Sequence, residues 1–262
     1  MKVLLVSANT EQVNMMAMPL GLACVAEAVK KAGHKVAFLD LMFEADIQSV
    51  LTETIVTVKP DCIGISVRNI DNQRMEETAF LLEKIKEVVA HCRGISDAPL
   101  VLGGAGYTIF PEEALAYLNA DMGIEGEGEV AFPALLSALE NGEDTTTIPG
   151  IHVAGEKPRH PKVFSNTLDM LPLPDPAVLL PSVSKNPDPW IPVQTRRGCP
   201  FKCSYCSTAN IEGTAIRKRS PEAIVAWLGQ WVQAGGRNFY FVDNTFNVPE
   251  AYAKALCRQI RE

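Results

Sequence analysis

The chain has 262 residues, of which 47% are hydrophobic, and a formal net charge of −7. The acidic total argues against a nucleic-acid surface over the whole chain, and the sequence holds no apolar run of about 18 residues that would predict a membrane span. The apolar N-terminus has no small-residue cleavage site after it, so it predicts a buried strand in a cytoplasmic protein with reduced thiols.

The first part of the chain alternates short apolar strands with longer helical patterns, which is typical of βαβ units around a parallel sheet. The expected strands are 3–7, 35–41, 62–67, 100–102 and 122–124. The expected helices are 19–31, 46–58, 72–91, 112–118 and one that ends at 139. The pattern predicts an α/β fold in which residues 1–145 form a doubly wound, Rossmann-like parallel sheet.

Small and polar residues follow several of these strands, where the ligands of doubly wound sheets bind. Ser66 follows the third strand, and Gly103, Gly104 and Ala105 follow the fourth. A run of alternating glutamate and glycine follows the fifth, beginning with Glu125, Gly126 and Glu127. Each group alone is better explained by ordinary turn chemistry. Together, at the ends of three strands, they favour a ligand site.

Residues 146–190 are rich in proline, and we expect an extended, semi-rigid linker there. Within it, 151–153 and 162–164 could pair as a small hairpin. The βα pattern then resumes over 191–262. Its expected strands are 191–195 and 238–242, and its expected helices are 221–234 and 250–261.

Three of the seven cysteines, Cys199, Cys203 and Cys206, lie in one C-x3-C-x2-C loop. Three thiolates in a tight loop can hold three irons of a [4Fe–4S] cluster and leave the fourth iron open to another ligand. A structural zinc site normally needs four protein ligands in paired C-x2-C spacing. The nearest further candidates, His160 and Cys257, are distant in sequence, so the spacing favours a cluster.

Other features of this region have two interpretations each. The four remaining cysteines are best explained as small buried hydrophobic residues: Cys24, Cys62, Cys92 and Cys257. The window 196–219 holds six basic residues against the single acid Glu212. This window forms either a rim of solvated charge or a funnel for an anionic ligand.

The cysteine loop, with Tyr205 before its last cysteine, resembles the defining motif of radical S-adenosylmethionine (SAM) enzymes. Its surroundings, at 195–207, 219–222 and 241–247, resemble the class of these enzymes with an N-terminal cobalamin-binding domain. Matching features in residues 1–145, the first unit of the chain, are 19–22, Gly103-Gly104 and 126–129. The resemblance implies a partial (β/α)6 barrel that begins at residue 191. About six βα units would complete it and this sequence supplies two, so we expect a C-terminally truncated barrel.

The resemblance implies three cofactors, namely a [4Fe–4S] cluster on the three cysteines, SAM on the open iron, and cobalamin in the first unit. Tyr205 would shield the cluster, and Asp243 would either contact a ligand or cap a turn. Residues 7–21 contain no histidine that could ligate cobalt, so Arg68 and Asn69 are the candidates near the lower face of the corrin. A loop with Met15, Met16 and Met18 would pack on the ring or fill a gap.

The implied reaction is cleavage of SAM to a 5′-deoxyadenosyl radical, followed by methylation of an unactivated carbon in a small-molecule or peptide substrate. Flavodoxin or ferredoxin would supply the electron. Three alternatives stay open, namely a radical cyclase, an enzyme that modifies transfer RNA, and a module that binds cobalamin and a cluster without catalysis. The acidic total disfavours the RNA alternative.

Overall fold

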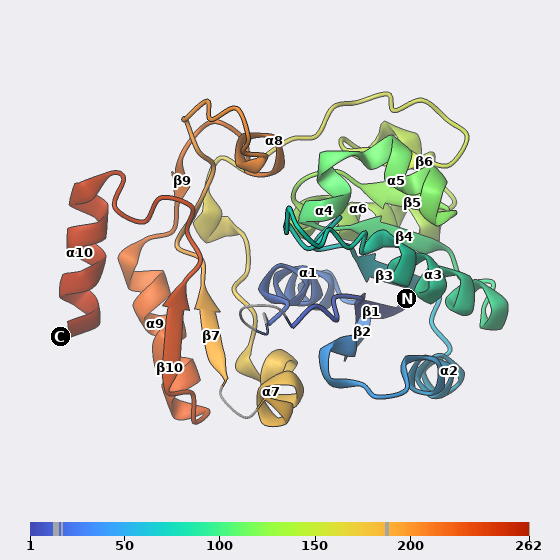
Figure 1. Cartoon of the computed structure of the whole chain (residues 1–262), viewed down its shortest axis with the longest axis horizontal. Helices are drawn as coiled ribbons and strands as arrows, with labels where there is room; N and C mark the ends of the chain where they lie inside the picture. Colours follow the sequence, from blue (N-terminus) through green and yellow to red (C-terminus); the bar gives the residue numbers. More distant parts are fainter. Residues whose placement is uncertain (13–15, 17, 187–188, 262) are drawn as a thin grey trace.

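The structure, a computed structural model, describes residues 1–12, 16, 18–186 and 189–261. Its centre is a six-stranded sheet in the order β2-β1-β3-β4-β5-β6 (Figure 1). The strands are β1 (Lys2–Ser7), β2 (Lys35–Asp40), β3 (Cys62–Ser66), β4 (Leu100–Gly103), β5 (Met122–Ile124) and β6 (Ile151–Val153). The first five are parallel and β6 is antiparallel to β5, so the predicted doubly wound α/β fold is confirmed.

Helices cover both faces of this sheet because its strands are apolar on both sides. In β1, Val3 and Leu5 pack on one side with residues of α1 (Leu20–Lys31) and α6 (Gly128–Asn141). The intervening Leu4 and Val6 pack on the other side. The helices that contribute to that second core are α2 (Ile47–Val58), α3 (Leu82–Ile95) and α5 (Pro111–Leu118).

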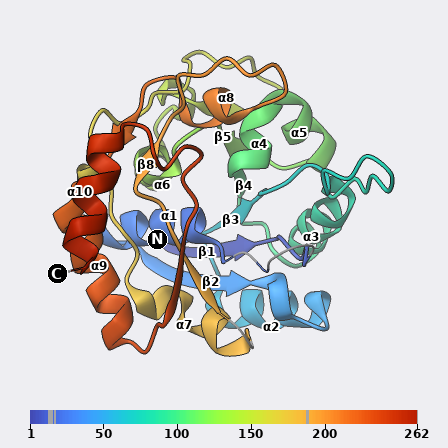
Figure 2. The same cartoon turned by 60° about the vertical axis from the view of Figure 1, so that its left-hand side comes forward.

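The C-terminal unit continues the first core. This unit comprises the elements from β7 (Trp190–Val193) to α10 (Glu250–Arg261). Strand β7 pairs in parallel with β10 (Asn238–Phe241), and α9 (Pro221–Gln233) packs against α10. Ile191, Trp227 and Trp231 belong to the same apolar cluster as α1 and α6. Figures 1 and 2 show this unit standing beside α1. The two units therefore share one continuous core.

The segment between β7 and α9 closes over the end of the first sheet. A two-stranded antiparallel pair, β8 (Arg196–Arg197) and β9 (Arg217–Lys218), brackets the cysteine loop and α8 (Thr208–Glu212). Helix α8 contacts α4 (Ala105–Ile109), which follows β4 directly. The cysteine loop therefore lies close to the carboxyl ends of the parallel strands (Figure 2).

The structure corrects the predicted start of the third helix, which begins at Leu82 rather than at residue 72. Residues 71–80 form a loop closed by an Asp71–Phe80 bridge. The Asn72 Oδ1 atom accepts hydrogen bonds from the backbone N–H groups of Arg74 and Ala79. Such local side-chain bonds offer the backbone an alternative to the helix, which explains the delayed start.

The expected hairpin in the proline-rich stretch is wrong. Strand β6 pairs with β5 instead and so extends the main sheet. The expectation of an extended linker also fails at α7 (Pro176–Lys185), because Asp175 caps that helix and Pro176 occupies its first turn. Three short 3-10 helices complete the elements of the described residues, namely η1 (Leu41–Phe43), η2 (Thr145–Thr147) and η3 (Leu168–Met170). The division of the chain at residues 145 and 190 stays a prediction.

Other expectations have mixed outcomes. Cys24, Cys62 and Cys92 are buried as predicted, whereas Cys257 is exposed. Met18 is buried in the shared core and also lines the cavity described below, so both of its interpretations stay open, while Met15 lies outside the described residues. Among the helices that the structure describes, none is both long and apolar enough to cross a membrane.

Leu4 is fully buried under the second helix layer, so we expect Leu4→Ala to lower the free energy of unfolding by about 2–5 kcal/mol. Urea denaturation measures this loss. Val56→Ala, on the exposed face of α2, is the control and should change stability by less than about 0.5 kcal/mol. Equal losses in the two variants would contradict the assigned core.

Candidate functional site

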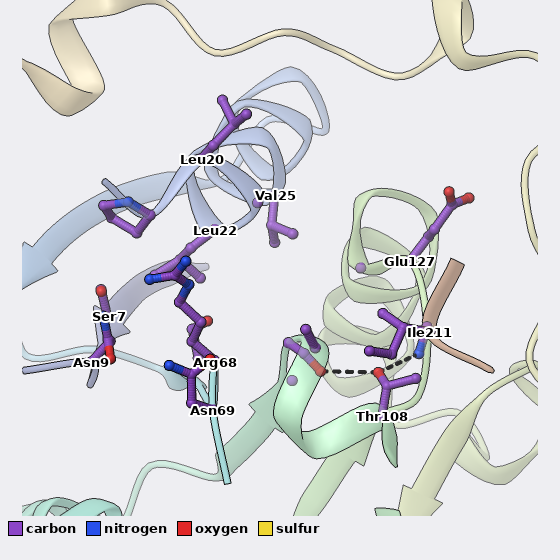
Figure 3. A pocket seen from close by; sticks show the side chains of 18 of the residues that line it. Ser7, Asn9, Leu20, Leu22, Val25, Arg68, Asn69, Thr108, Glu127 and Ile211 are labelled. Carbon is purple, nitrogen blue, oxygen red and sulfur yellow. Dashed lines mark hydrogen bonds between the residues drawn. The ribbon is translucent and has the colours of Figure 1, made fainter. Parts of the chain in front are cut away.

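A cavity of about 690 Å³ lies between the carboxyl ends of the main sheet and the C-terminal unit. We call it the inter-unit cavity because both units line it. Figure 3 shows Ser7, Asn9, Arg68 and Asn69 on one side of it, and Thr108, Glu127 and Ile211 on the other. The C-terminal unit contributes Pro192, Gln194, Arg197, Ser207, Thr208, Ile211, Glu212, Tyr240, Val242 and Asn244.

The inter-unit cavity has an apolar inner end and open backbone along one wall. Leu5, Gly64 and Phe132 lie at the inner end, and a Cβ on Gly64 would come within 2.7 Å of Leu5 Cδ2. Gly104 has φ +100°, and a Cβ there would come within 2.7 Å of the Val67 carbonyl oxygen. Only glycine fits that position, which leaves the backbone accessible to a ligand.

The structure brings eight of the sequence-predicted ligand residues to this cavity. They are Ser66, Arg68, Asn69, Gly103, Gly104, Ala105, Gly126 and Glu127. The remaining predicted residues are not among its lining residues: Glu125, Tyr205, Asp243, Cys199, Cys203 and Cys206. Sequence reasoning missed Asn9, Gln194 and Tyr240 in the lining, whereas Arg197 belongs to the basic window that it singled out. For Asn9 a signal existed, because it follows the carboxyl end of β1.

Glu125 joins the main sheet to α8. Its carboxylate accepts hydrogen bonds from Lys162 Nζ at 2.7 Å and lies 3.1 Å from His152 Nε2. Lys162 also donates to Asn210 Oδ1 in α8, at 2.9 Å. Burial raises the pKa of Glu125, but Lys162 and His152 outweigh it, and the pKa lies below its ordinary value. The Glu125 carboxylate is therefore paired with protein side chains, His152 and Lys162.

A buried ionic network ties the cysteine loop to the first unit. The Arg197 guanidinium donates to Glu127 Oε1 at 3.1 Å and to Glu129 Oε1 at 2.5 Å. Arg217 donates to the same Glu127 oxygen at 2.6 Å, and the Ser165 amide donates to the other at 2.9 Å. All four charged side chains are less than 10% exposed. We call these four residues the Glu–Arg network.

Both interpretations of the basic window fail for four of its six cations. Arg196, Arg197, Arg217 and Arg219 are buried, so they form neither a solvated rim nor an open funnel. Arg219 donates to the carbonyl oxygens of Leu168 and Leu171, both at 2.7 Å. Arg197, Arg217 and Arg219 therefore act inside the fold, on carboxylates and carbonyls.

The cysteine loop is anchored at its start and exposed at its end. The Gly198 amide donates to Glu212 Oε2 at 3.1 Å, and the Cys199 amide donates to the Gly213 carbonyl at 3.0 Å. Cys199 is buried, whereas Cys203 and Cys206 are exposed. Within the described part of the chain, no three potential ligands are gathered in metal-binding geometry.

The end of the cysteine loop lies at the rim of the inter-unit cavity. Cys206 Sγ donates to Thr208 Oγ1 at 3.2 Å, and Thr208 lines the cavity. Thr208 Oγ1 in turn donates to Asn244 Oδ1 at 3.3 Å. As a donor set, three thiols in one short loop fit iron, and the two exposed thiols are accessible to it.

Asp243 lies at the carboxyl end of β10 and holds neighbouring backbone in place. Its carboxylate accepts from the Thr195 amide at 2.8 Å, the Thr195 hydroxyl at 2.7 Å and the Arg196 amide at 3.1 Å. Burial raises the pKa of Asp243, and these hydrogen bonds oppose that effect. This is the capping alternative of the two that the sequence left open.

The profile of the B12 binding domain family matches residues 6–136, which is half of the chain. The chain belongs to this family. Among curated relatives, the tryptophan 2-C-methyltransferase of Streptomyces laurentii is 25% identical over 96% of this chain and 51% of its own length. The hopanoid C-3 methylase of Methylococcus capsulatus is 30% identical over 79% of this chain and 39% of its own length. The chain thus spans about half or less of these relatives.

A solved structure of a radical SAM methyltransferase from Kitasatospora setae has cobalamin and a [4Fe–4S] cluster bound. It matches the present structure with a TM-score of 0.86 and 26% identity, over 98% of this chain and 52% of that chain. The resemblance to cobalamin-dependent radical SAM enzymes is therefore confirmed.

Breaking the Glu–Arg network should be costly, because a buried charge would lose its partner. We expect Glu129→Gln to lower the free energy of unfolding at pH 7 by about 3–5 kcal/mol, measured by urea denaturation. The exposed Glu113→Gln is the matched control and should change stability by less than about 0.5 kcal/mol.

The pH dependence of unfolding in the wild type and in Glu129→Gln tests whether the Glu129 carboxylate stabilises the fold through its charge. Burial raises its pKa, but Arg197 outweighs burial and holds the pKa below the ordinary 4.5. A lowered pKa stabilises the fold above about pH 4.5, and that contribution is lost as the pH falls through the folded-state value. The difference between wild type and Glu129→Gln should therefore shrink in acid. A difference that is constant with pH would show that the carboxylate charge is irrelevant.

Proposed function

We propose that this chain supplies the cobalamin-binding and cluster-binding parts of a radical SAM methyltransferase that acts on a small molecule. One observation carries the proposal. The inter-unit cavity is lined on one side by a B12 binding domain and on the other by the unit that holds the C-x3-C-x2-C loop. The two cofactors of such an enzyme would thus meet across one cavity.

The residues of the first unit fit cobalamin. The apolar inner end at Leu5, Gly64 and Phe132 would hold the nucleotide tail, beside the accessible backbone of Gly103 and Gly104. Ser66, Ala105, Gly126 and Glu127 would line the path of the tail. Arg68 and Asn69, at the wide mouth, would lie near the lower face of the corrin. The amide of Asn9, on the same side of the cavity as Arg68 and Asn69, has an unpartnered buried donor, which suits a ligand rich in carboxamides.

The cysteine loop would hold the [4Fe–4S] cluster through Cys199, Cys203 and Cys206. The cluster, once bound, would bind SAM at its open iron and supply the electron that cleaves it to a 5′-deoxyadenosyl radical. Tyr205, within the loop, is 91% exposed, so its ring can cover the cluster from water. Asp243 would fix Thr195 and Arg196, the residues that lead into the loop.

Gln194, Tyr240 and Asn244 present polar and aromatic groups to the cavity from the C-terminal unit. They are the candidates to orient the molecule that is methylated. One relative is named for methylation of tryptophan, which suits a small-molecule substrate here as well. A flavodoxin- or ferredoxin-type donor would deliver the electron to the exposed side of the cysteine loop.

Anaerobic reconstitution should give about four irons per wild-type chain and a broad visible absorption band. Cys203→Ala should lose the band, because two thiolates do not hold the cluster. Cys203 is exposed and is not among the lining residues of the inter-unit cavity, so hydroxocobalamin binding should be unchanged. Cys257→Ala, at another exposed cysteine, is the control and should keep both properties. A full complement of iron in Cys203→Ala would refute the assignment.

Incubation with SAM and a reductant tests whether the chain can cleave SAM. Release of 5′-deoxyadenosine from the wild type, and not from Cys203→Ala, would support a catalytic chain. Cobalamin and iron binding without this release would identify a module that binds the cofactors without catalysis.

Gly103→Val should weaken hydroxocobalamin binding by about tenfold or more, measured by absorbance titration. A Cβ at this position would have only the Ile124 carbonyl oxygen near it, at 4.0 Å, so the fold should tolerate the side chain. The valine methyl groups would instead occupy cavity space. Gly94→Ala, which has open space and lies on α3 away from the cavity, is the control. Equal affinity in a folded Gly103→Val protein would exclude this wall as the site.

A further inference from the structure

Asn9 is a buried residue with an unused hydrogen-bond donor. It lies two residues beyond the end of β1, lines the inter-unit cavity and is 9% exposed. Its Oδ1 atom accepts from the Glu11 amide at 3.4 Å. Its Nδ2 atom has no hydrogen-bond partner in the part of the chain that the structure describes. One end of the amide is thus fixed while the other is unsatisfied.

This combination singles out Asn9. Among the described residues, five have a buried side-chain polar atom without a partner: Asn9, Tyr107, His152, Arg196 and Trp231. Of these five, Asn9 is the one that lines the cavity. An unsatisfied buried donor is destabilising, and in native proteins such a donor usually finds a ligand or an ordered water. A donor at a cavity wall is therefore available to a ligand in that cavity.

The depth of Asn9 in the cavity indicates which part of a ligand it meets. Leu5 and Gly64 lie within strands β1 and β3, at the inner end, whereas Asn9 lies beyond the strand ends. Figure 3 shows Asn9 beside Ser7, on the same side as Arg68 and Asn69. The neighbouring Ser7 hydroxyl already has a hydrogen bond with the Asp40 carboxylate. Asn9 thus offers a free neutral donor to the cavity beyond the strand ends.

We propose that Asn9 Nδ2 donates a hydrogen bond to a carboxamide oxygen at the edge of the corrin ring, an inference that rests on the proposed cobalamin binding. Carboxamides surround the corrin ring, and their carbonyl oxygens are neutral acceptors suited to an amide N–H. The bond would satisfy the free donor and fix the rotation of the ring over the cavity mouth. Asn9 would therefore be a binding residue of the corrin part, separate from the wall that holds the nucleotide tail.

The test is titration of the purified chain with hydroxocobalamin and with cobinamide, which keeps the ring carboxamides and lacks the nucleotide. Asn9→Ala should weaken binding of both corrinoids by about tenfold. Asn9→Asp keeps an acceptor for the Glu11 amide and replaces the Nδ2 donor with a carboxylate oxygen, which cannot donate to a carboxamide oxygen, so it should weaken both as well. Asn141→Ala, exposed at the end of α6, is the matched control.

Thermal unfolding without corrinoid separates binding from a structural role. Asn9→Ala removes an unsatisfied donor together with the long 3.4 Å hydrogen bond from the Glu11 amide, so the unfolding temperature should stay close to that of the wild type. Wild-type affinity in both Asn9 variants would overturn the inference and leave the proposed function standing. A loss confined to hydroxocobalamin would place Asn9 at the nucleotide and also overturn it. A wild-type chain that binds neither corrinoid would overturn the inference and the proposed function together.

Discussion

The Glu–Arg network is the interaction on which the geometry of the candidate site depends. Glu127 and Glu129 follow the last parallel strand, and Arg197 precedes the first cysteine of the loop by two residues. Their hydrogen bonds cross between units that are about 70 residues apart in sequence. Because these charges are buried, separating the units would leave carboxylates and guanidinium groups without partners, at a cost of several kcal/mol. The network therefore fixes the position of the cysteine loop relative to the cavity residues that follow β1, β3, β4 and β5.

Apolar packing supports the same arrangement. The core between α1 and α6 continues into Ile191, Trp227 and Trp231 of the C-terminal unit, so one hydrophobic layer underlies both. The inter-unit cavity is the gap that this layer and the network leave at the carboxyl ends of the strands. A doubly wound sheet binds its ligand at that edge. Here the C-terminal unit covers part of that edge and adds polar groups, so that residues of both units line one open cavity.

Much of the site could be predicted because it follows from local rules. The strand periodicity placed Gly103 and Gly104 at a strand end, and they line the cavity. The burial of Arg197 and Arg217 could not be predicted, because it depends on carboxylates distant in sequence. Charge composition alone predicts that such arginines are exposed to solvent. The late start of α3 at Leu82 escaped prediction because the Asn72 side chain satisfies its neighbours. The partner of β6 depended on the open edge of β5.

The central claim is that cobalamin occupies the inter-unit cavity and that the cluster lies on the cysteine loop at the rim of this cavity, with the two units held together by the Glu–Arg network. Electron paramagnetic resonance of the chain loaded with cob(II)alamin tests it most directly. When the cluster is reduced, the account predicts that the cob(II)alamin signal broadens through magnetic coupling between the two centres. A cob(II)alamin signal that is unchanged by reduction of a fully loaded cluster would contradict the account, because the two cofactors would then be far apart.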